Sequence, residues 1–239
     1  MKRSHIVLLT VLIGLAVILS ACVPGPRVTG SPGLTLSDEN VFLSYSNFVY
    51  GLNIEDGSVA WQYPDERSNQ IVFFAPPLFQ DDQIYVGDLA NNFYKLDATN
   101  GDVEWTFSDA EGFYIGQAAF DNDQIYAPSN DGSLYVLNID GDLLWTYKTG
   151  RYIWAQPQIS NDAVFLASMD HFVYALTKDG EEIWEQKLSG AVVSSPVLSA
   201  DEDVLFVGTM GREMVALDTI SGDILWSFDA GGSLDSVWA

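Results

Sequence analysis

The chain has 239 residues, of which 48% are hydrophobic and 13% aromatic, with 33 acidic against 10 basic residues and a formal net charge of −23. The composition excludes an intrinsically disordered protein and suits one domain with a large core. The charge excludes nucleic acid and anionic lipid headgroups as partners, because a strongly negative surface repels both.

The first 21 residues are predicted to be a lipoprotein signal peptide. Lys2 and Arg3 give a positive start, and an apolar run of 14 residues follows over 6–19. A spanning helix needs roughly 20 apolar residues, so the shorter run favours a cleaved segment over a retained one. Leu19-Ser20-Ala21-Cys22 resembles the bacterial lipobox, and Cys22 is the single cysteine. An ordinary secretory signal cut near Ala21 is the alternative.

The mature chain is therefore expected to begin at Cys22 with a lipid-modified thiol and no internal disulfide. Residues 22–33 are rich in Pro and Gly and are predicted to form an irregular tether. The globular domain is predicted over 34–239, outside the cytoplasm and anchored to a membrane of the bacterial cell envelope.

A tryptophan recurs through this domain at nearly constant spacing. Successive copies are 44, 40, 39 and 42 residues apart, and each closes a short apolar strand after a turn with Gly. A period near 40 residues built from short strands indicates an all-β propeller of four-stranded antiparallel blades, one blade per repeat. The five tryptophans are Trp61, Trp105, Trp145, Trp184 and Trp226. Residues 231–239 match the start of a sixth repeat, which either closes the ring or begins further blades.

The clearest repeat predicts strands over 195–198, 204–208, 213–218 and 223–228. The middle strands are apolar at nearly every position, which indicates that neighbouring blades cover both faces. Segments of small residues at 75–77, 116–118, 155–157 and 194–196 are predicted as innermost strands near the axis. Asp140-Gly141 and Asp179-Gly180 suit two-residue type I′ hairpins.

The recurring tryptophans are predicted to have a structural docking role. On the outermost strand the ring can cover a sheet edge, while the indole N–H donates to a carbonyl of a neighbouring blade. A single ligand does not need five equivalent sites, which argues against a ligand-binding role.

Ala216, Asp218, Gly222 and Trp226 resemble the tryptophan-docking repeat of propellers of the PQQ (pyrroloquinoline quinone) type, Ala-x-Asp-x-x-Thr-Gly-x-x-x-Trp. The segment 95–105 is similar, and the resemblance extends over about 34–239. No tryptophan is followed by Asp as in WD40 repeats, and the double glycine of kelch repeats is lacking. The family has two relevant branches, the quinoprotein dehydrogenases and the lipid-anchored scaffolds of the BamB type in outer-membrane protein assembly. The lipobox favours the second branch, which usually has eight blades where five are visible here.

The first branch implies an oxidoreductase that holds PQQ against a disulfide of adjacent cysteines, beside Ca²⁺ and a catalytic Asp. This chain has no cysteine pair, and only Asp235 places a carboxylate on a predicted axis-facing segment. His171 stands alone once the signal peptide is removed, so no metal-ligand cluster is formed. We therefore predict no enzyme, with no catalytic, metal or cofactor residues. A PQQ-dependent oxidoreductase-like domain, or a fragment of a larger PQQ-repeat protein, is the alternative.

The sequence instead favours a protein-binding scaffold, which is predicted to be a monomer. Its binding surface is predicted to be one rim of the propeller that carries aromatic and basic residues. The loops that join blades carry aromatic residues and Arg, a combination typical of protein interfaces. The predicted partner-binding residues are Phe113, Tyr114, Arg151, Tyr152, Trp154, His171 and Arg212. Alternatively, Phe74, Ile115, Trp154 and Val193 occupy equivalent positions that seal the core.

Acidic residues gather in predicted turns, at 81–82, 121–123 and 201–203. There they favour turn formation and solubility. A basic protein partner or loosely held divalent cations is the alternative explanation of the charge.

Overall fold

The computed structural model describes residues 33–229 and 231, which form twenty strands. These strands make five separate four-stranded antiparallel sheets, which confirms the predicted blades. No helix in the described range has the length and apolar character needed to cross a membrane. The predicted signal peptide, Cys22 and the predicted sixth first strand lie outside the described residues, whereas Gly33, assigned to the tether, already belongs to β1.

Each blade consists of four strands that are consecutive in the chain and adjacent in the sheet. Blade 1 contains β1 (Gly33–Leu36), β2 (Asn40–Tyr45), β3 (Phe48–Asn53) and β4 (Val59–Tyr63), and blade 2 contains β5 (Leu78–Gln80), β6 (Gln83–Gly87), β7 (Phe93–Asp97) and β8 (Val103–Phe107). Blade 3 contains β9 (Ala119–Asp121), β10 (Gln124–Pro128), β11 (Ser133–Asn138) and β12 (Leu143–Lys148), and blade 4 contains β13 (Gln158–Ile159), β14 (Val164–Ala167), β15 (Phe172–Leu176) and β16 (Glu182–Lys187). Blade 5 contains β17 (Val197–Leu198), β18 (Val204–Gly208), β19 (Glu213–Asp218) and β20 (Ile224–Asp229).

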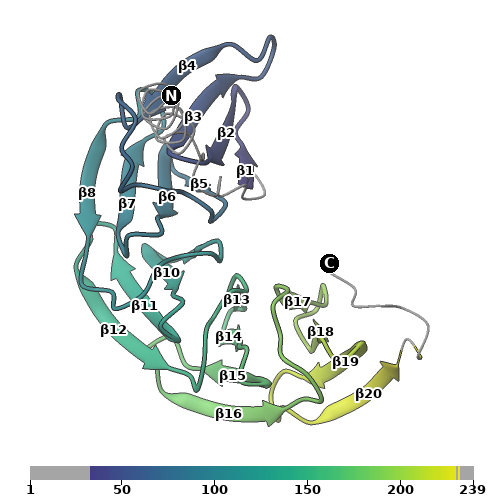
Figure 1. Cartoon of the computed structure of the whole chain (residues 1–239). Helices are drawn as coiled ribbons and strands as arrows, with labels where there is room; N and C mark the ends of the chain where they lie inside the picture. The colour runs from purple at the N-terminus through teal and green to yellow at the C-terminus, as the bar shows by residue number, and fades with distance from the viewer. Residues whose placement is uncertain (1–32, 230, 232–239) are drawn as a thin grey trace, which may run out of the picture.

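The blades stand side by side along an arc (Figure 1). The first strand of each blade faces the inside of the arc, and β4, β8, β12, β16 and β20 form its outer wall. Blades 1 and 5 border an opening in this arc. The arrangement is a propeller whose ring is incomplete over the described residues.

Tryptophans on the outer strands lock each blade to the next. The indole N–H of Trp61 donates to the carbonyl of Ala98 at 2.8 Å, and that of Trp105 donates to Ile139 at 2.9 Å. The same bond joins Trp145 to Lys178 at 3.1 Å and Trp184 to Thr219 at 3.0 Å. Each acceptor lies in the turn between the third and fourth strands of the following blade. These four residues thus make the bond between blades that the predicted docking role requires.

A glycine in the same turn supports each of these tryptophans. Gly101, Gly141, Gly180 and Gly222 all have φ between +76° and +89°. A Cβ at any of them would lie 2.5–2.8 Å from the tryptophan ring of the preceding blade. Only glycine combines this backbone conformation with so close an approach. The glycine therefore serves both the turn and the blade interface.

The core is made of apolar layers between successive blades. Strands β11 and β14 in the middle of the arc are buried at nearly every position, which confirms that both of their faces are covered. In β18 of blade 5 only alternate residues are buried. The difference follows from position, because the described residues cover only one face of a terminal blade.

Two local predictions are wrong. Asp140 and Asp179 do not have positive φ, so the turns at Gly141 and Gly180 are not type I′. Gly141 N–H donates to the carbonyl of Asn138, and Gly180 N–H donates to the carbonyl of Thr177. Each bond closes a type I turn in which the glycine takes the bulge position. Type I′ geometry occurs instead at Asp81-Asp82 and at Asn122-Asp123, where all four residues have φ between 48° and 62°.

The innermost strands begin later than predicted. The segments of small residues precede β5, β9, β13 and β17 and do not belong to them. Pro77, Pro157 and Pro196 stand directly before three of these strands. Proline has no N–H to donate to a ladder, so pairing starts only after it.

Candidate protein-binding rim

One face of the arc is built from two kinds of loop. The turns between second and third strands meet the connections between blades through one repeated backbone hydrogen bond. This bond runs from Phe73 N to Ser46 O, from Tyr114 N to Asp88 O, from Ile153 N to Ser129 O and from Val192 N to Ser168 O, at 2.7–3.2 Å. We call this face the rim. The bonds hold both sets of loops together on this face.

The four donor residues of this bond seal the core beneath the rim. Phe73, Tyr114, Ile153 and Val192 are each at most 2% exposed. Tyr114 is therefore wrongly assigned to a partner-binding surface. The alternative prediction is also displaced by one residue, because Phe74, Ile115, Trp154 and Val193 are only half-buried. In an extended segment a shift of one residue exchanges the inward and outward sides.

Arg151, Tyr152 and Trp154 form a stack on the rim. The Tyr152 and Trp154 rings are 6.2 Å apart and nearly parallel, at 8°. The guanidinium carbon of Arg151 lies 5.9 Å from the centre of the Tyr152 ring. The Trp154 indole donates to Asn130 Oδ1 at 2.7 Å, and Asn130 N donates to Phe113 O at 2.8 Å. Phe113 is thereby joined to the stack.

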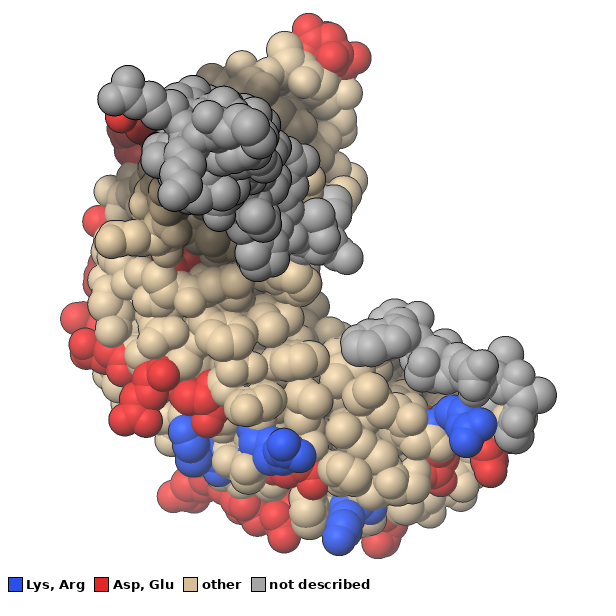
Figure 2. Space-filling view, viewed as in Figure 1, with Lys and Arg blue, Asp and Glu red and all other residues tan. Residues whose placement is uncertain are grey.

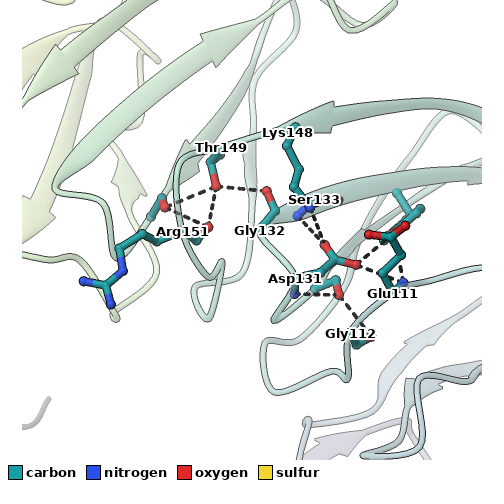
Figure 3. A network of polar contacts seen from close by, with 11 residues as sticks. Glu111, Gly112, Asp131, Gly132, Ser133, Lys148, Thr149 and Arg151 are labelled. Atoms are coloured by element: carbon teal, nitrogen blue, oxygen red, sulfur yellow. Dashed lines mark hydrogen bonds and ion pairs between the residues drawn. The ribbon is translucent and has the colours of Figure 1, made fainter.

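A polar network fixes the backbone under this stack (Figure 3). The Thr149 hydroxyl lies 2.9 Å from the carbonyl of Gly132 and 2.6 Å from that of Arg151. The buried Ser168 hydroxyl contacts the carbonyls of Arg151 and Tyr152, both at 3.3 Å. The Arg151 side chain extends away from the network (Figure 3). The loop is thus held by its main chain, which leaves the side chains of Arg151 and Tyr152 exposed.

Carboxylates order the neighbouring turns. Asp131 accepts from Tyr135 Oη at 2.8 Å, and Asp170 accepts from Tyr174 Oη at 2.7 Å. Burial raises the pKa of Asp131, but hydrogen bonds from Ser133 and Tyr135 outweigh it and hold the pKa below its ordinary value. The residues predicted from sequence do not include this pair, although both copies share the same spacing of Asp and Tyr.

His171 and Arg212 occupy equivalent turn positions with unusual backbone. Their φ values are 79° and 66°, and Gly132 has φ 90° at the same position of blade 3. Non-glycine residues rarely adopt this conformation, and it carries strain. Met169 N donates to Tyr152 O at 3.0 Å, which brings the His171 turn against the stack, whereas Arg212 lies in the next blade.

The rim concentrates positive charge on an acidic protein. Of the seven Lys and Arg residues within the described range, five lie here: Arg67, Lys148, Arg151, Lys187 and Arg212. Figure 2 shows basic side chains over blades 3 to 5 on the face turned to the viewer. Lys187 Nζ lies 5.9 Å from the centre of the Phe172 ring, a second cation–aromatic contact.

Acidic residues mark the other end of the blades. Asp38, Glu39, Asp81 and Asp82 line a groove of about 890 Å³ between the first hairpins of blades 1 and 2. Among the described residues no group of three or more His, Cys, Asp or Glu is arranged to hold a metal ion. Asp235 lies outside the described residues. The site that the described residues form is therefore the rim, where Lys and Arg side chains and flat aromatic rings are available for contact with a partner.

The fold and this loop arrangement define a propeller of the tryptophan-docking class. The profile of the family described as outer membrane protein assembly factor BamB matches residues 21–153 and 140–237, and the chain belongs to this family.

Similar structures include BamB from Moraxella catarrhalis, with a TM-score of 0.71 and 18% identity over 84% of this chain and 64% of that one. The computationally designed Ika8 protein has a TM-score of 0.72 and 15% identity, over 84% of this chain and 62% of that one. A chain of the Mitotic Checkpoint Complex has a TM-score of 0.74 and 13% identity, over 87% of this chain and 67% of that one.

At these identities the structural matches show the fold alone. This chain spans about 64% of the length of the Moraxella BamB. No curated protein sequence matches significantly.

Proposed function

We propose that this protein is a lipid-anchored, extracytoplasmic scaffold that binds a protein partner through its rim during outer-membrane protein assembly. The observation that carries the proposal is the Arg151, Tyr152 and Trp154 stack, presented on a fixed backbone. Aromatic residues with Arg dominate the energy of protein interfaces, and a pre-ordered loop loses little entropy on binding. Membership of the BamB family supports the assembly role.

Site-specific photo-crosslinking tests the rim. A photoreactive phenylalanine at Tyr152, in the full chain in native membranes, is expected to give one reproducible protein adduct. The matched control is the same group at Ile183, which is 48% exposed on the outer strand β16. No adduct at Tyr152, or the same adducts from both positions, would contradict the proposed surface.

The anchor has its own test. Cys22→Ser is expected to abolish incorporation of labelled palmitate and to release the protein from membranes on washing. Retention of both label and membrane association would overturn the lipid anchor while leaving the rim unaffected. Equilibrium dialysis with PQQ is expected to show no saturable binding, and saturable binding would favour the oxidoreductase alternative.

A further inference from the structure

The rim repeats the same junction between neighbouring blades, so its residues can be compared position by position. A second backbone bond fixes the alignment, since one residue of each turn donates its N–H to the carbonyl of the preceding connection at 2.8–3.0 Å. The donors are Leu89, Asn130, Met169 and Met210. A residue that serves only the fold is expected to recur in character from junction to junction, whereas a functional residue departs from the pattern.

The connection between blades 3 and 4 departs from the pattern at Trp154. The equivalent positions hold Phe74, Ile115 and Val193, which have no side-chain donor. Of the six tryptophans in the described range, five lie on outer strands, and Trp154 alone lies in a rim connection. Its indole N–H therefore needs an acceptor of its own, which is Asn130 Oδ1 at 2.7 Å.

Arg151 departs from the pattern in the same connection. Glycine occupies this position in the connections on either side, as Gly112 and Gly190. A Cβ at Gly112 would lie 2.5 Å from the backbone nitrogen of Asp131. One at Gly190 would lie 2.4 Å from the backbone nitrogen of Gly211. The repeat thus favours glycine here, and a long cationic side chain that breaks this local rule indicates a functional position.

Asn130 joins this exceptional connection to the turn of blade 3. The same turn position holds Leu89 in blade 2 and Met169 in blade 4, neither of which has an amide oxygen. In blade 1 it holds Asn47, whose Oδ1 accepts from Arg67 Nε at 3.1 Å. Both asparagines therefore bind a donor side chain of the connection that follows their blade. An asparagine at this position orients one long side chain on the rim.

We propose that Asn130 positions the Arg151, Tyr152 and Trp154 stack for contact with the partner protein, an inference that rests on the proposed function of the rim. The hydrogen bond from Trp154 to Asn130 holds a ring that lies parallel to Tyr152, at 8° and 6.2 Å. Tyr152 in turn contacts the Arg151 guanidinium, 5.9 Å from its ring centre. Without the acceptor the indole N–H turns towards water, because an unpaired donor is costly. The parallel contact with Tyr152 is then lost.

Crosslinking to the partner measures the effect of this bond. The full chain with the photoreactive phenylalanine at Tyr152, which keeps an aromatic ring in the stack, is irradiated in native membranes. Asn130→Leu removes the acceptor and is expected to fold, because the turn of blade 2 carries Leu89 at this position. We expect its yield of the partner adduct to fall at least threefold. Asn130→Asp keeps an oxygen acceptor and is expected to keep the yield of the unsubstituted chain.

A double-mutant cycle determines whether Asn130 acts through the indole. Trp154→Phe keeps a ring for the stack and removes its N–H, so its adduct yield is expected to fall as far as that of Asn130→Leu. The double variant is expected to fall no further, because two substitutions that break the same bond are not additive. Leu89→Met, a change at the equivalent position of blade 2, is the matched control and is expected to leave the yield unchanged.

A measurement without the partner reports on the stack itself. Acrylamide quenching of Trp154 emission is taken as the difference between each protein and its Trp154→Phe form, for the full chain in detergent. We expect it to rise at least twofold in Asn130→Leu and to stay unchanged in Asn130→Asp.

The outcomes separate this inference from the proposed function. An unsubstituted chain that gives no adduct at Tyr152 overturns the proposed function, and the positioning role of Asn130 with it. An adduct whose yield is equal in Asn130→Leu, or whose losses add up in the double variant, overturns the positioning role alone. Unchanged quenching of Trp154 in Asn130→Leu does the same, because the ring is then held by other contacts.

Discussion

The buried hydroxyl of Tyr114 is expected to lower the free energy of unfolding. Its side chain is fully buried against Gly87 and Phe93, and its hydroxyl has no hydrogen-bonding partner among the described residues. A buried polar group without a partner costs about 1–3 kcal/mol. Tyr114→Phe removes that group and keeps the ring, so we expect the free energy of unfolding to rise by about 1 kcal/mol. Denaturant unfolding measures the change, and a loss of stability would mean that the hydroxyl has a partner.

The docking tryptophans allow a comparison of one substitution in two settings. Trp184→Phe removes the N–H that donates to Thr219 and leaves that carbonyl without its bond. We expect a loss of about 1–3 kcal/mol in the free energy of unfolding. Trp226→Phe, made in the half-exposed last copy and measured at low concentration, is expected to change it by less than about 0.5 kcal/mol. Equal losses would show that the indole hydrogen bond contributes little.

At the scale of the element, the turns between third and fourth strands both reverse the chain and hold the adjacent blade. Alanine at Gly180 or Gly57 pays the same backbone strain, about 1–2 kcal/mol, because both have positive φ. Only at Gly180 would the new Cβ lie 2.6 Å from a tryptophan, Trp145. We expect Gly180→Ala to destabilise the protein by about 1–3 kcal/mol more than Gly57→Ala, through overpacking. Thermal unfolding of both variants at low concentration checks this, and equal costs would contradict tight docking.

The elements that the sequence predicts well are those specified by local pattern. The third strand predicted over 213–218 matches β19, because its apolar run is bounded by turn residues on both sides. The docking role of the tryptophans also follows locally, from the strand and turn that precede each one. Which turn type forms does not, since Gly141 can satisfy either geometry until the position of the Trp105 ring is known.

The rim was predictable in composition and unpredictable in orientation. Residue type and the place of the loop between two repeats are enough to predict that Arg151, Tyr152 and Trp154 belong to the rim. Tyr114 was misplaced, because a short extended loop does not reveal which of two adjacent aromatics faces the core. The bond that orients Trp154 comes from Asn130, which is 24 residues away in another loop. Such a contact exists only once the blades have packed.

At the scale of the whole molecule, buried tyrosines should make the fold sensitive to alkali. Burial, with the nearby Glu104 charge, raises the pKa of Tyr85 to about 12, and burial with Asp121 does the same for Tyr126. The folded state therefore keeps protons that the unfolded chain loses near pH 10. The stabilisation is complete below pH 10 and is lost as the pH rises towards 12.

Alkaline titration followed by circular dichroism and by phenolate absorbance measures this effect. We expect phenolate from these residues to appear together with loss of the β-sheet signal, and Tyr126→Phe to make the transition shallower. Phenolate formation near pH 10 with the β-sheet signal intact would show that the rings are accessible in the folded protein.

The indole seated on a glycine of the adjoining turn also makes the protein modular. Each repeat of about forty residues carries both a docking tryptophan and an acceptor turn with its glycine. Any two such repeats can therefore pack together through the same hydrogen bond and ring contact. Duplicating residues 155–193, from the entry of blade 4 to that of blade 5, should thus lengthen the arc by one sheet without a new kind of contact. Gene duplication can change the span of such a protein in single steps while its loops diversify independently.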